Sequence, residues 1–199
     1  GDQGFDFIPD LYVRHVVQKV LGPQVAVKWA KILHAGEFET TRTGDVIRLS
    51  VHALNPLSTA YHESLHGLFA NLKRDKLTDI SDVLEKAGSS APVLGQLRAL
   101  LSSEPAALRQ LTDPEERAAY MYQFWAQGKL NLGPKATTVF ERIARFIREV
   151  TGLWTNDERA EQILAYFHSG DYQANRGDPN AVRQALMESS TTRAIAKVK

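Results

Sequence analysis

Two histidines four residues apart enclose a glutamate in the stretch 61–69, which reads YHESLHGLF. In an α-helix, residues i and i+4 lie one above the other on the same face, so His62 and His66 can direct their imidazole nitrogens at one point. Zinc accepts neutral histidine nitrogens in a near-tetrahedral arrangement. Glu63 is next to this pair without being a ligand itself, where a carboxylate can take a proton from a zinc-bound water. The pattern therefore predicts a hydrolytic zinc site.

The same stretch carries the apolar residues that a helix needs in order to be buried: Leu65, Leu68, Phe69 and Leu72. One face would then pack on the core and the other would face the metal. The alternative interpretation is an ordinary surface or core helix with two incidental histidines. The position of this helix, directly after a predicted β-hairpin, favours the metal interpretation.

A catalytic zinc usually has three protein ligands and one open position, so a third ligand is needed. The best candidate is a carboxylate at the start of another helix. Asp113 is expected to cap that helix and Pro114 to begin it. We expect Glu116 to be the third ligand, with Glu115 as the alternative. Alternatively, both could be ordinary first-turn acids that the helix dipole favours, and Glu116 could be only the partner of Asp113 in a capping box.

The remaining histidines are weaker candidates for the third ligand: His15, His34, His52 and His168. His168 stands alone near a predicted helix end before Gly170. We expect it to interact with the C-terminal end of the helix dipole.

The spacing of apolar residues predicts an early helix over 11–21 and a strand from Val25 to about Ile32. A hairpin follows, in which a short strand at Phe38 is joined by turn residues to a second strand at 46–51. The motif helix is expected next, from a cap at Ser58 or Thr59 to about Lys73. Further helices are expected near 76–88, 92–102, 104–111, 114–127, 135–151, 156–169 and 178–196.

These elements predict an α+β fold, with a small antiparallel sheet packed on the motif helix and a mainly helical C-terminal half. We expect three parts along the chain. They are an N-terminal segment and helix (1–24), a core that carries the metal site (25–151) and a helical C-terminal extension (152–199).

Composition narrows the classes of function. The chain has 199 residues, a formal net charge of +1 and no cysteine, so a metal must be held by histidine and carboxylate groups. We expect neither a nucleic-acid partner nor a membrane partner, because the charge is balanced and no apolar run approaches the roughly 20 residues that span a bilayer. One predicted helix carries a basic row that two glutamates interrupt, which indicates a solvated face: Lys135, Arg142, Arg145 and Arg148, with Glu141 and Glu149.

A hairpin, then His-Glu-x-x-His on a helix, then Glu-x-x-Ala on a later helix resembles the gluzincin type of zincin metallopeptidases. Residues 36–69, 115–150 and 157–172 also resemble the compact zincin-like domains of very large polyvalent proteins from phages and other mobile elements. The resemblance covers roughly residues 35–173. It implies that the core 25–151 is zincin-like and holds one zinc ion.

The resemblance also implies that the second hairpin strand, about Asp45–Val51, lies beside the cleft and pairs with an extended substrate. Thermolysin-like members use a further histidine or tyrosine to stabilise the oxyanion. No fixed spacing identifies that residue here, and the candidates are Tyr120, Tyr122, His168 and Tyr172.

The expected function is that of a zinc-dependent endopeptidase acting on a protein or peptide, with Glu63 as general base and His62, His66 and Glu116 as ligands. One alternative is a decayed zincin that binds a partner protein through a sheet edge. Another is a zinc hydrolase that acts on a non-peptide amide. The resemblance places the chain in the cytoplasm of a bacterial host or in a virion, as part of a larger polyprotein.

Overall fold

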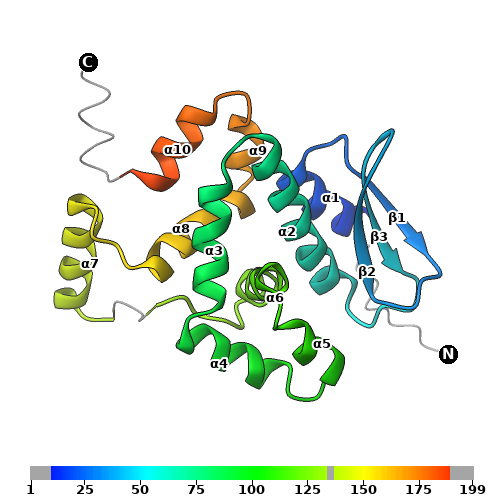
Figure 1. The fold of residues 1–199 in the computed structure, drawn as a ribbon, viewed down its shortest axis with the longest axis horizontal. Coiled ribbons are helices and arrows are strands. Elements are labelled where there is room, and N and C mark those ends of the chain that lie inside the picture. Colours follow the sequence, from blue (N-terminus) through cyan, green and yellow to red (C-terminus); the bar gives the residue numbers. More distant parts are fainter. Residues whose placement is uncertain (1–9, 134–136, 189–199) are drawn as a thin grey trace.

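The computed structural model describes residues 10–133 and 137–188 and shows an α+β protein in which helices predominate (Figure 1). The strands are β1 (Ala26–Ala30), β2 (Gly36–Thr41) and β3 (Gly44–Ser50). The helices are α1 (Asp10–Leu21), α2 (Pro56–Arg74), α3 (Thr78–Gly88), α4 (Ala91–Leu100), α5 (Pro105–Gln110), α6 (Pro114–Ala126), α7 (Val139–Thr151), α8 (Asn156–His168), α9 (Asp171–Asn175) and α10 (Pro179–Met187). The sheet lies at one end of the longest axis and α7 at the other.

The sheet is mixed, so the prediction of an antiparallel sheet was wrong in part. Its strand order is β1-β3-β2, with β3 parallel to β1 and antiparallel to β2. The reason is the loop 31–35, which carries the chain across the end of β3 so that β1 and β2 lie on opposite sides of it. Backbone hydrogen bonds fix this crossing, because Ser50 N–H donates to the Ala35 carbonyl at 2.8 Å and Val51 N–H to the Ala30 carbonyl at 3.0 Å.

The predicted hairpin is confirmed, and its two strands are β2 and β3. Gly44 begins β3 with φ +132°, a backbone conformation that side-chain-bearing residues rarely adopt. The central strand β3 uses both of its edges within the sheet, on β1 and on β2. The expectation that the strand at Asp45–Val51 pairs with substrate is therefore wrong, and the edge next to the motif helix belongs to β2.

The motif helix is α2, and it begins earlier than predicted. Asn55 caps it by accepting the Ser58 N–H at 3.1 Å, and Pro56 is its first residue. Ser58 and Thr59 are thus inside the helix and do not cap it, because the fixed φ of proline starts the helical turn two residues earlier. The apolar face is buried as expected, with Leu65, Leu68 and Leu72 each 0% exposed.

Neighbouring elements approach α2 closely at Gly67. A Cβ atom at this position would lie 2.7 Å from Leu21 Cδ1 of α1 and 3.1 Å from a ring carbon of Phe38 in β2. Glycine therefore lets α1 and the sheet pack against one side of α2. The other side faces α6 and α3 (Figure 1).

The C-terminal half is helical as predicted, with differences at the helix ends. The helix expected over 135–151 begins at Val139, after a capping box between Thr138 and Glu141. The helix expected over 178–196 is observed as α10 up to Met187, and Glu188 after it is extended. The rest of that prediction, 189–196, lies outside the described residues, as does Lys135. The short helix α9 was not predicted.

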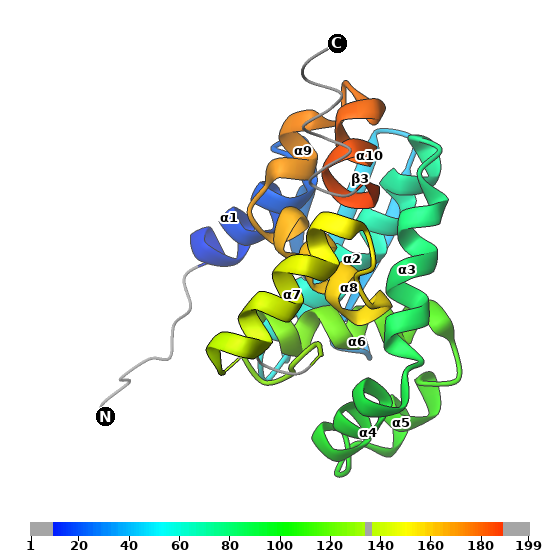
Figure 2. The same cartoon turned by 90° about the vertical axis from the view of Figure 1, so that its left-hand side faces the viewer.

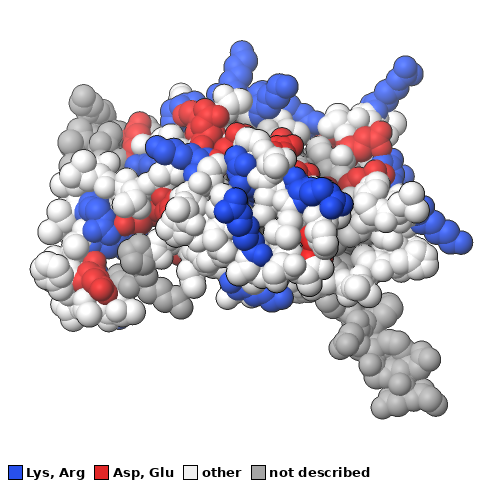
Figure 3. Space-filling model, turned by 60° about the horizontal axis from the view of Figure 1, so that its bottom comes forward, with Lys and Arg blue, Asp and Glu red and all other residues white. Residues whose placement is uncertain are grey.

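One hydrophobic cluster extends from Val13 in α1 to Leu186 in α10 and includes residues from all three predicted parts of the chain. The boundaries between those parts stay predictions. Among the described residues, no helix is both long and apolar enough to cross a membrane. Basic and acidic side chains are interspersed on the face shown in Figure 3.

Candidate metal centre

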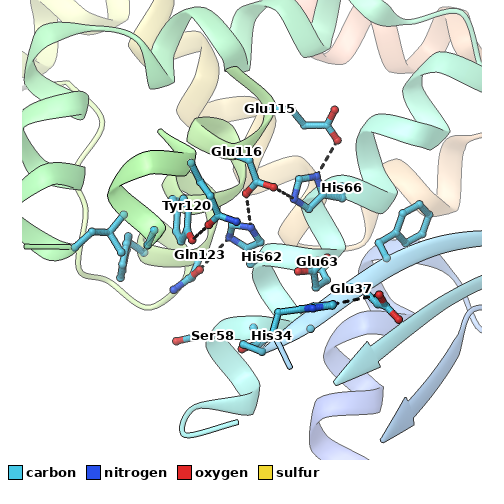
Figure 4. Close-up of a pocket in the computed structure, with 18 of the residues that line it drawn as sticks. His34, Glu37, Ser58, His62, Glu63, His66, Glu115, Glu116, Tyr120 and Gln123 are labelled. Carbon is cyan, nitrogen blue, oxygen red and sulfur yellow. Dashed lines mark hydrogen bonds and ion pairs between the residues drawn. The ribbon is translucent and has the colours of Figure 1, made fainter. Parts of the chain in front are cut away.

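α2 and α6 face each other through three side chains whose ligand atoms converge. His62 Nε2 lies 2.9 Å from Glu116 Oε2, and His66 Nε2 lies 3.3 Å from Glu116 Oε1 (Figure 4). One ligand atom from each residue lies within 4.8 Å of the others. The structure thus brings together the two predicted histidines and the preferred glutamate.

Local sequence explains why these groups meet. The four-residue spacing places both histidines on one face of α2. Asp113 accepts the Glu115 N–H at 2.9 Å and so begins α6 as predicted. Ala118 and Ala119 are fully buried, and their small side chains allow a close approach between helices. The capping-box role considered for Glu116 is replaced by its contacts with α2.

The other ring nitrogen of each histidine is held by a residue of α6. His62 Nδ1 donates to Gln123 Oε1 at 3.2 Å, and His66 Nδ1 donates to Glu115 Oε1 at 2.8 Å. A neutral imidazole that donates from Nδ1 has its lone pair on Nε2, where it can ligate a metal. Glu115 therefore contacts the nitrogen of His66 that points away from Glu116.

The dimensions of the site fit a tetrahedral ion. Ligand bonds of about 2.0–2.1 Å at tetrahedral angles separate neighbouring ligand atoms by about 3.3 Å. The nitrogen–oxygen separations of 2.9 and 3.3 Å, which go to the two different oxygens of Glu116, are close to that value, and one ligand atom from each of the three residues lies within 4.8 Å of the others. Two neutral imidazoles and one carboxylate are also a donor set that zinc accepts, with a fourth position left for water or substrate. His62, His66 and Glu116 could thus hold a metal ion.

Without a metal, the same groups form a charged cluster. Burial by itself lowers the pKa of His66, but its hydrogen bonds to Glu115 and Glu116 outweigh burial and raise that pKa to about 10. Burial by itself raises the pKa of Glu116, but the hydrogen bonds of His62 and His66 hold it well below its usual range. The carboxylate of Glu116 is therefore ionised, as a metal ligand has to be.

Glu63 lies beside the cluster and is almost completely buried, with 8% of its surface exposed. Figure 4 places it between the two histidines and the segment that carries His34 and Glu37. Burial raises the pKa of the Glu63 carboxyl, and the charges of the two histidines offset part of that rise. A carboxyl with a raised pKa is a better proton acceptor near neutral pH than an exposed glutamate.

These groups line a cleft of about 1510 Å³. One wall is formed by the loop 31–35, the start of β2 and the loop 52–55, and the opposite wall by residues of α3, α5 and α6. Residues of α2 between them run from Ser58 to Lys73 and form the floor. The cleft therefore continues along α2 on both sides of the two histidines.

The four candidates for oxyanion stabilisation lie in different places. The Tyr120 ring lies 4.4 Å from the His62 ring and lines the cleft. Tyr122 is fully buried and its hydroxyl lies 3.2 Å from His168 Nδ1, at the end of α8. Tyr172 is also fully buried and donates to Asp75 at 2.7 Å. Of the four, Tyr120 is adjacent to the cluster of His62, His66 and Glu116.

Sequence reasoning missed two features of the cleft. Gln123 orients His62, and a signal for it was present, because seven residues after Glu116 is two helical turns on the same face. His34 and His52, considered only as ligands, line the cleft, and His34 Nε2 lies 3.1 Å from Glu37 Oε2. No local pattern connects the loop residue His34 to the site.

Comparisons with known proteins identify no relative: no protein-family model, no curated protein and no solved structure matches the chain.

Proposed function

We propose that the protein is a zinc-dependent endopeptidase. The observation that carries this proposal is the convergence of His62 Nε2, His66 Nε2 and Glu116 on one point, with a buried glutamate beside it in an open cleft. A metal site of three protein ligands with an adjacent general base is the arrangement that hydrolytic zinc chemistry requires.

Zinc held by His62, His66 and Glu116 would polarise the scissile carbonyl and lower the pKa of an attacking water. Glu63 accepts the proton of that water and then delivers it to the leaving amine. Gln123 and Glu115 keep the two imidazole rings in the orientation and tautomer that ligation needs.

An internal peptide bond suits this cleft better than a chain terminus. The cleft floor from Ser58 to Lys73 spans 15 residue steps of α2, or roughly 22 Å at the rise of an α-helix. That length accommodates about six or seven extended residues at about 3.3 Å each. Substrate would extend past both sides of the metal.

The edge of β2 that faces away from β3 is the candidate for pairing with substrate. Gly36, Glu37 and Phe38 of this strand line the cleft. Main-chain hydrogen bonds from such an edge bind an extended peptide with little dependence on its sequence. Pairing at β2 replaces the pairing expected for β3.

The experiment compares wild type with Glu63→Gln, each loaded with zinc and incubated with unfolded casein and with a bacterial extract. Glutamine keeps the shape of the side chain but cannot accept a proton, so we expect cleavage to fall at least about 10²–10⁴-fold while zinc is retained. Fragments are identified by mass spectrometry, with and without a chelator. Glu104→Gln, which changes another cleft glutamate, is the matched control and should cleave like wild type.

Identical cuts by wild type and Glu63→Gln would mean that a contaminant cleaves, and the proposal would fail. If neither protein cuts while both retain zinc and capture the same partner, a decayed zincin that binds proteins becomes the better account. The wider setting, a domain of a large phage or mobile-element polyprotein, rests on the resemblance of residues 35–173 alone.

A further inference from the structure

α7 is an amphipathic helix whose apolar side faces outward. It contains no buried residue, and five of its large apolar side chains are 52% to 80% exposed. We call these five residues the α7 stripe: Val139, Phe140, Ile143, Phe146 and Ile147. Exposed apolar residues are common singly, but a contiguous group of this kind marks an interaction surface.

The opposite side of α7 is held against α8 by ion pairs. Arg148 contacts Glu158 at 2.6 Å, and the Glu158 side chain is only 6% exposed. Arg145 contacts Glu161 at 3.1 Å. In Figure 2, which looks at this end of the molecule, α7 crosses in front of α8. These pairs fix which side of α7 faces the protein, and so they keep the stripe outward.

The spacing within the stripe is that of a helix-packing seam. Val139, Ile143 and Phe146 follow the four-then-three spacing of the core positions of a coiled coil, and Phe140 and Ile147 flank them on one side. Arg142 and Glu149 occupy the other flank, seven residues apart. One flank of the seam is thus apolar, and the other carries one charge of each sign.

We propose that a second copy of this chain covers the stripe, with the two α7 helices packed antiparallel across a two-fold axis. Such an axis reverses one helix, so like flanks face each other. Arg142 of each copy then faces Glu149 of the other, and Phe140 faces Ile147. Glu149 also keeps contacts within its own chain, and the pairing depends only on its sign and position. In a parallel pair, Arg142 would face the apolar Ile147 of the second copy.

A membrane surface fits the stripe less well. Helices that lie in a membrane interface carry clusters of lysine and arginine beside the apolar face. Here the flanking charges are of both signs, and Arg145 and Arg148 are already paired with glutamates of α8. A single 13-residue helix also buries less than the roughly 800 Å² per partner of a standard interface, so we expect a weak dimer with a Kd of about 10–100 μM.

Analytical ultracentrifugation of the full chain over a concentration series tests the proposal. Wild type should change from monomer to dimer as its concentration rises. Phe146→Asp should raise the dissociation constant of the dimer about 100-fold, because a two-fold interface loses the side chain twice. Leu11→Asp on α1, where Leu11 is 75% exposed, is the matched control and should dimerise like wild type. Circular dichroism checks that each variant is folded.

A charge exchange tests the antiparallel arrangement. Arg142→Glu should weaken the dimer about threefold to tenfold, and Arg142→Glu combined with Glu149→Arg should restore it.

A wild type that stays monomeric throughout overturns the proposal, as does a dimer that Phe146→Asp leaves intact. Failure of the double exchange to restore the dimer overturns the antiparallel pairing. Flotation of monomeric protein with anionic lipid vesicles would overturn the proposal of a second copy and show that the α7 stripe binds a membrane. None of these outcomes depends on zinc or on cleavage.

Discussion

Two helix pairs of this molecule, α2–α6 and α7–α8, turn charged side chains toward each other but match their charges differently. Between α7 and α8, each glutamate has its own arginine, Arg148 with Glu158 and Arg145 with Glu161. Between α2 and α6, the Nε2 atoms of His62 and His66 share the carboxylate of Glu116, while His66 Nδ1 also contacts Glu115. In the first arrangement each charge has one partner, whereas in the second three side chains converge on one point where they could hold a cation.

Burial alone does not distinguish the two pairs. The Glu158 side chain is 6% exposed, whereas the Glu116 side chain is 21% exposed, so the more buried acid belongs to the one-to-one ion pair. What separates them is the number of ligand atoms directed at the same place. Convergence, together with orienting bonds on the far ring nitrogens, is the better indication of a metal site in this fold.

The largest effect is expected from His62→Ala combined with His66→Ala. Wild type should bind about one zinc per chain, and the double variant should lose stoichiometric binding because only Glu116 remains of the three ligands. Metal analysis after dialysis measures this. His34→Ala, which changes a histidine on the cleft wall, should keep its zinc. Undiminished zinc binding by the double variant would show that the converging side chains of α2 and α6 do not hold the metal.

The next largest effect is a difference in zinc affinity between variants of the two neighbouring glutamates of α6. Glu116→Ala removes a proposed ligand and should abolish tight zinc binding. Glu115→Ala removes only the orienting bond to His66 and should lower zinc affinity about 10–100-fold. Competition with a chromogenic chelator measures both affinities. The opposite order would make Glu115 the ligand, and no effect from either would move the third ligand elsewhere.

A smaller effect is expected from Gly36→Ala at the start of β2. A Cβ atom there would lie 2.5 Å from Thr59 Cγ2, 3.1 Å from the Arg48 carbonyl oxygen and 3.2 Å from Glu63 Cγ, so Thr59, the strand or Glu63 has to shift. We expect zinc affinity to be unchanged and kcat/KM to fall about tenfold, since small displacements of a general base are costly. Gly95→Ala, where a Cβ meets nothing within 4 Å, is the control. Equal activity of the two variants would contradict the placement of Glu63.

The smallest effect is expected from variants of the ion pairs between α7 and α8. Arg148→Met leaves the buried Glu158 without its partner and should lower the free energy of unfolding by about 1–3 kcal/mol. Arg145→Met removes a more exposed pair and should cost about 0–1 kcal/mol. Thermal unfolding of the zinc-loaded protein measures both. Neither variant should change zinc affinity, and a loss of zinc in Arg148→Met would show that the two regions are coupled.

Several elements and part of the site could be predicted because they depend on residues close together in the chain. The four-residue spacing of His62 and His66 places them on one helix face wherever that helix lies. Asp113 and Pro114 begin α6 through local capping and a fixed φ angle. The turn before Gly44 joins β2 to β3 for the same kind of reason. In each case, backbone geometry over a few residues is sufficient to determine the feature.

Other features were decided only by the packing of distant segments. Residues that are adjacent on a helix point about 100° apart, so the docking angle of α6 on α2 determines that Glu116 meets both Nε2 atoms while Glu115 meets His66 Nδ1. The crossing of the loop 31–35 made the sheet mixed and gave the cleft-side edge to β2. The basic row on α7, predicted to be a solvated face, includes Arg145 and Arg148, which bind α8. Amphipathic spacing shows that a helix has two sides, but it contains no information about which side the rest of the chain contacts.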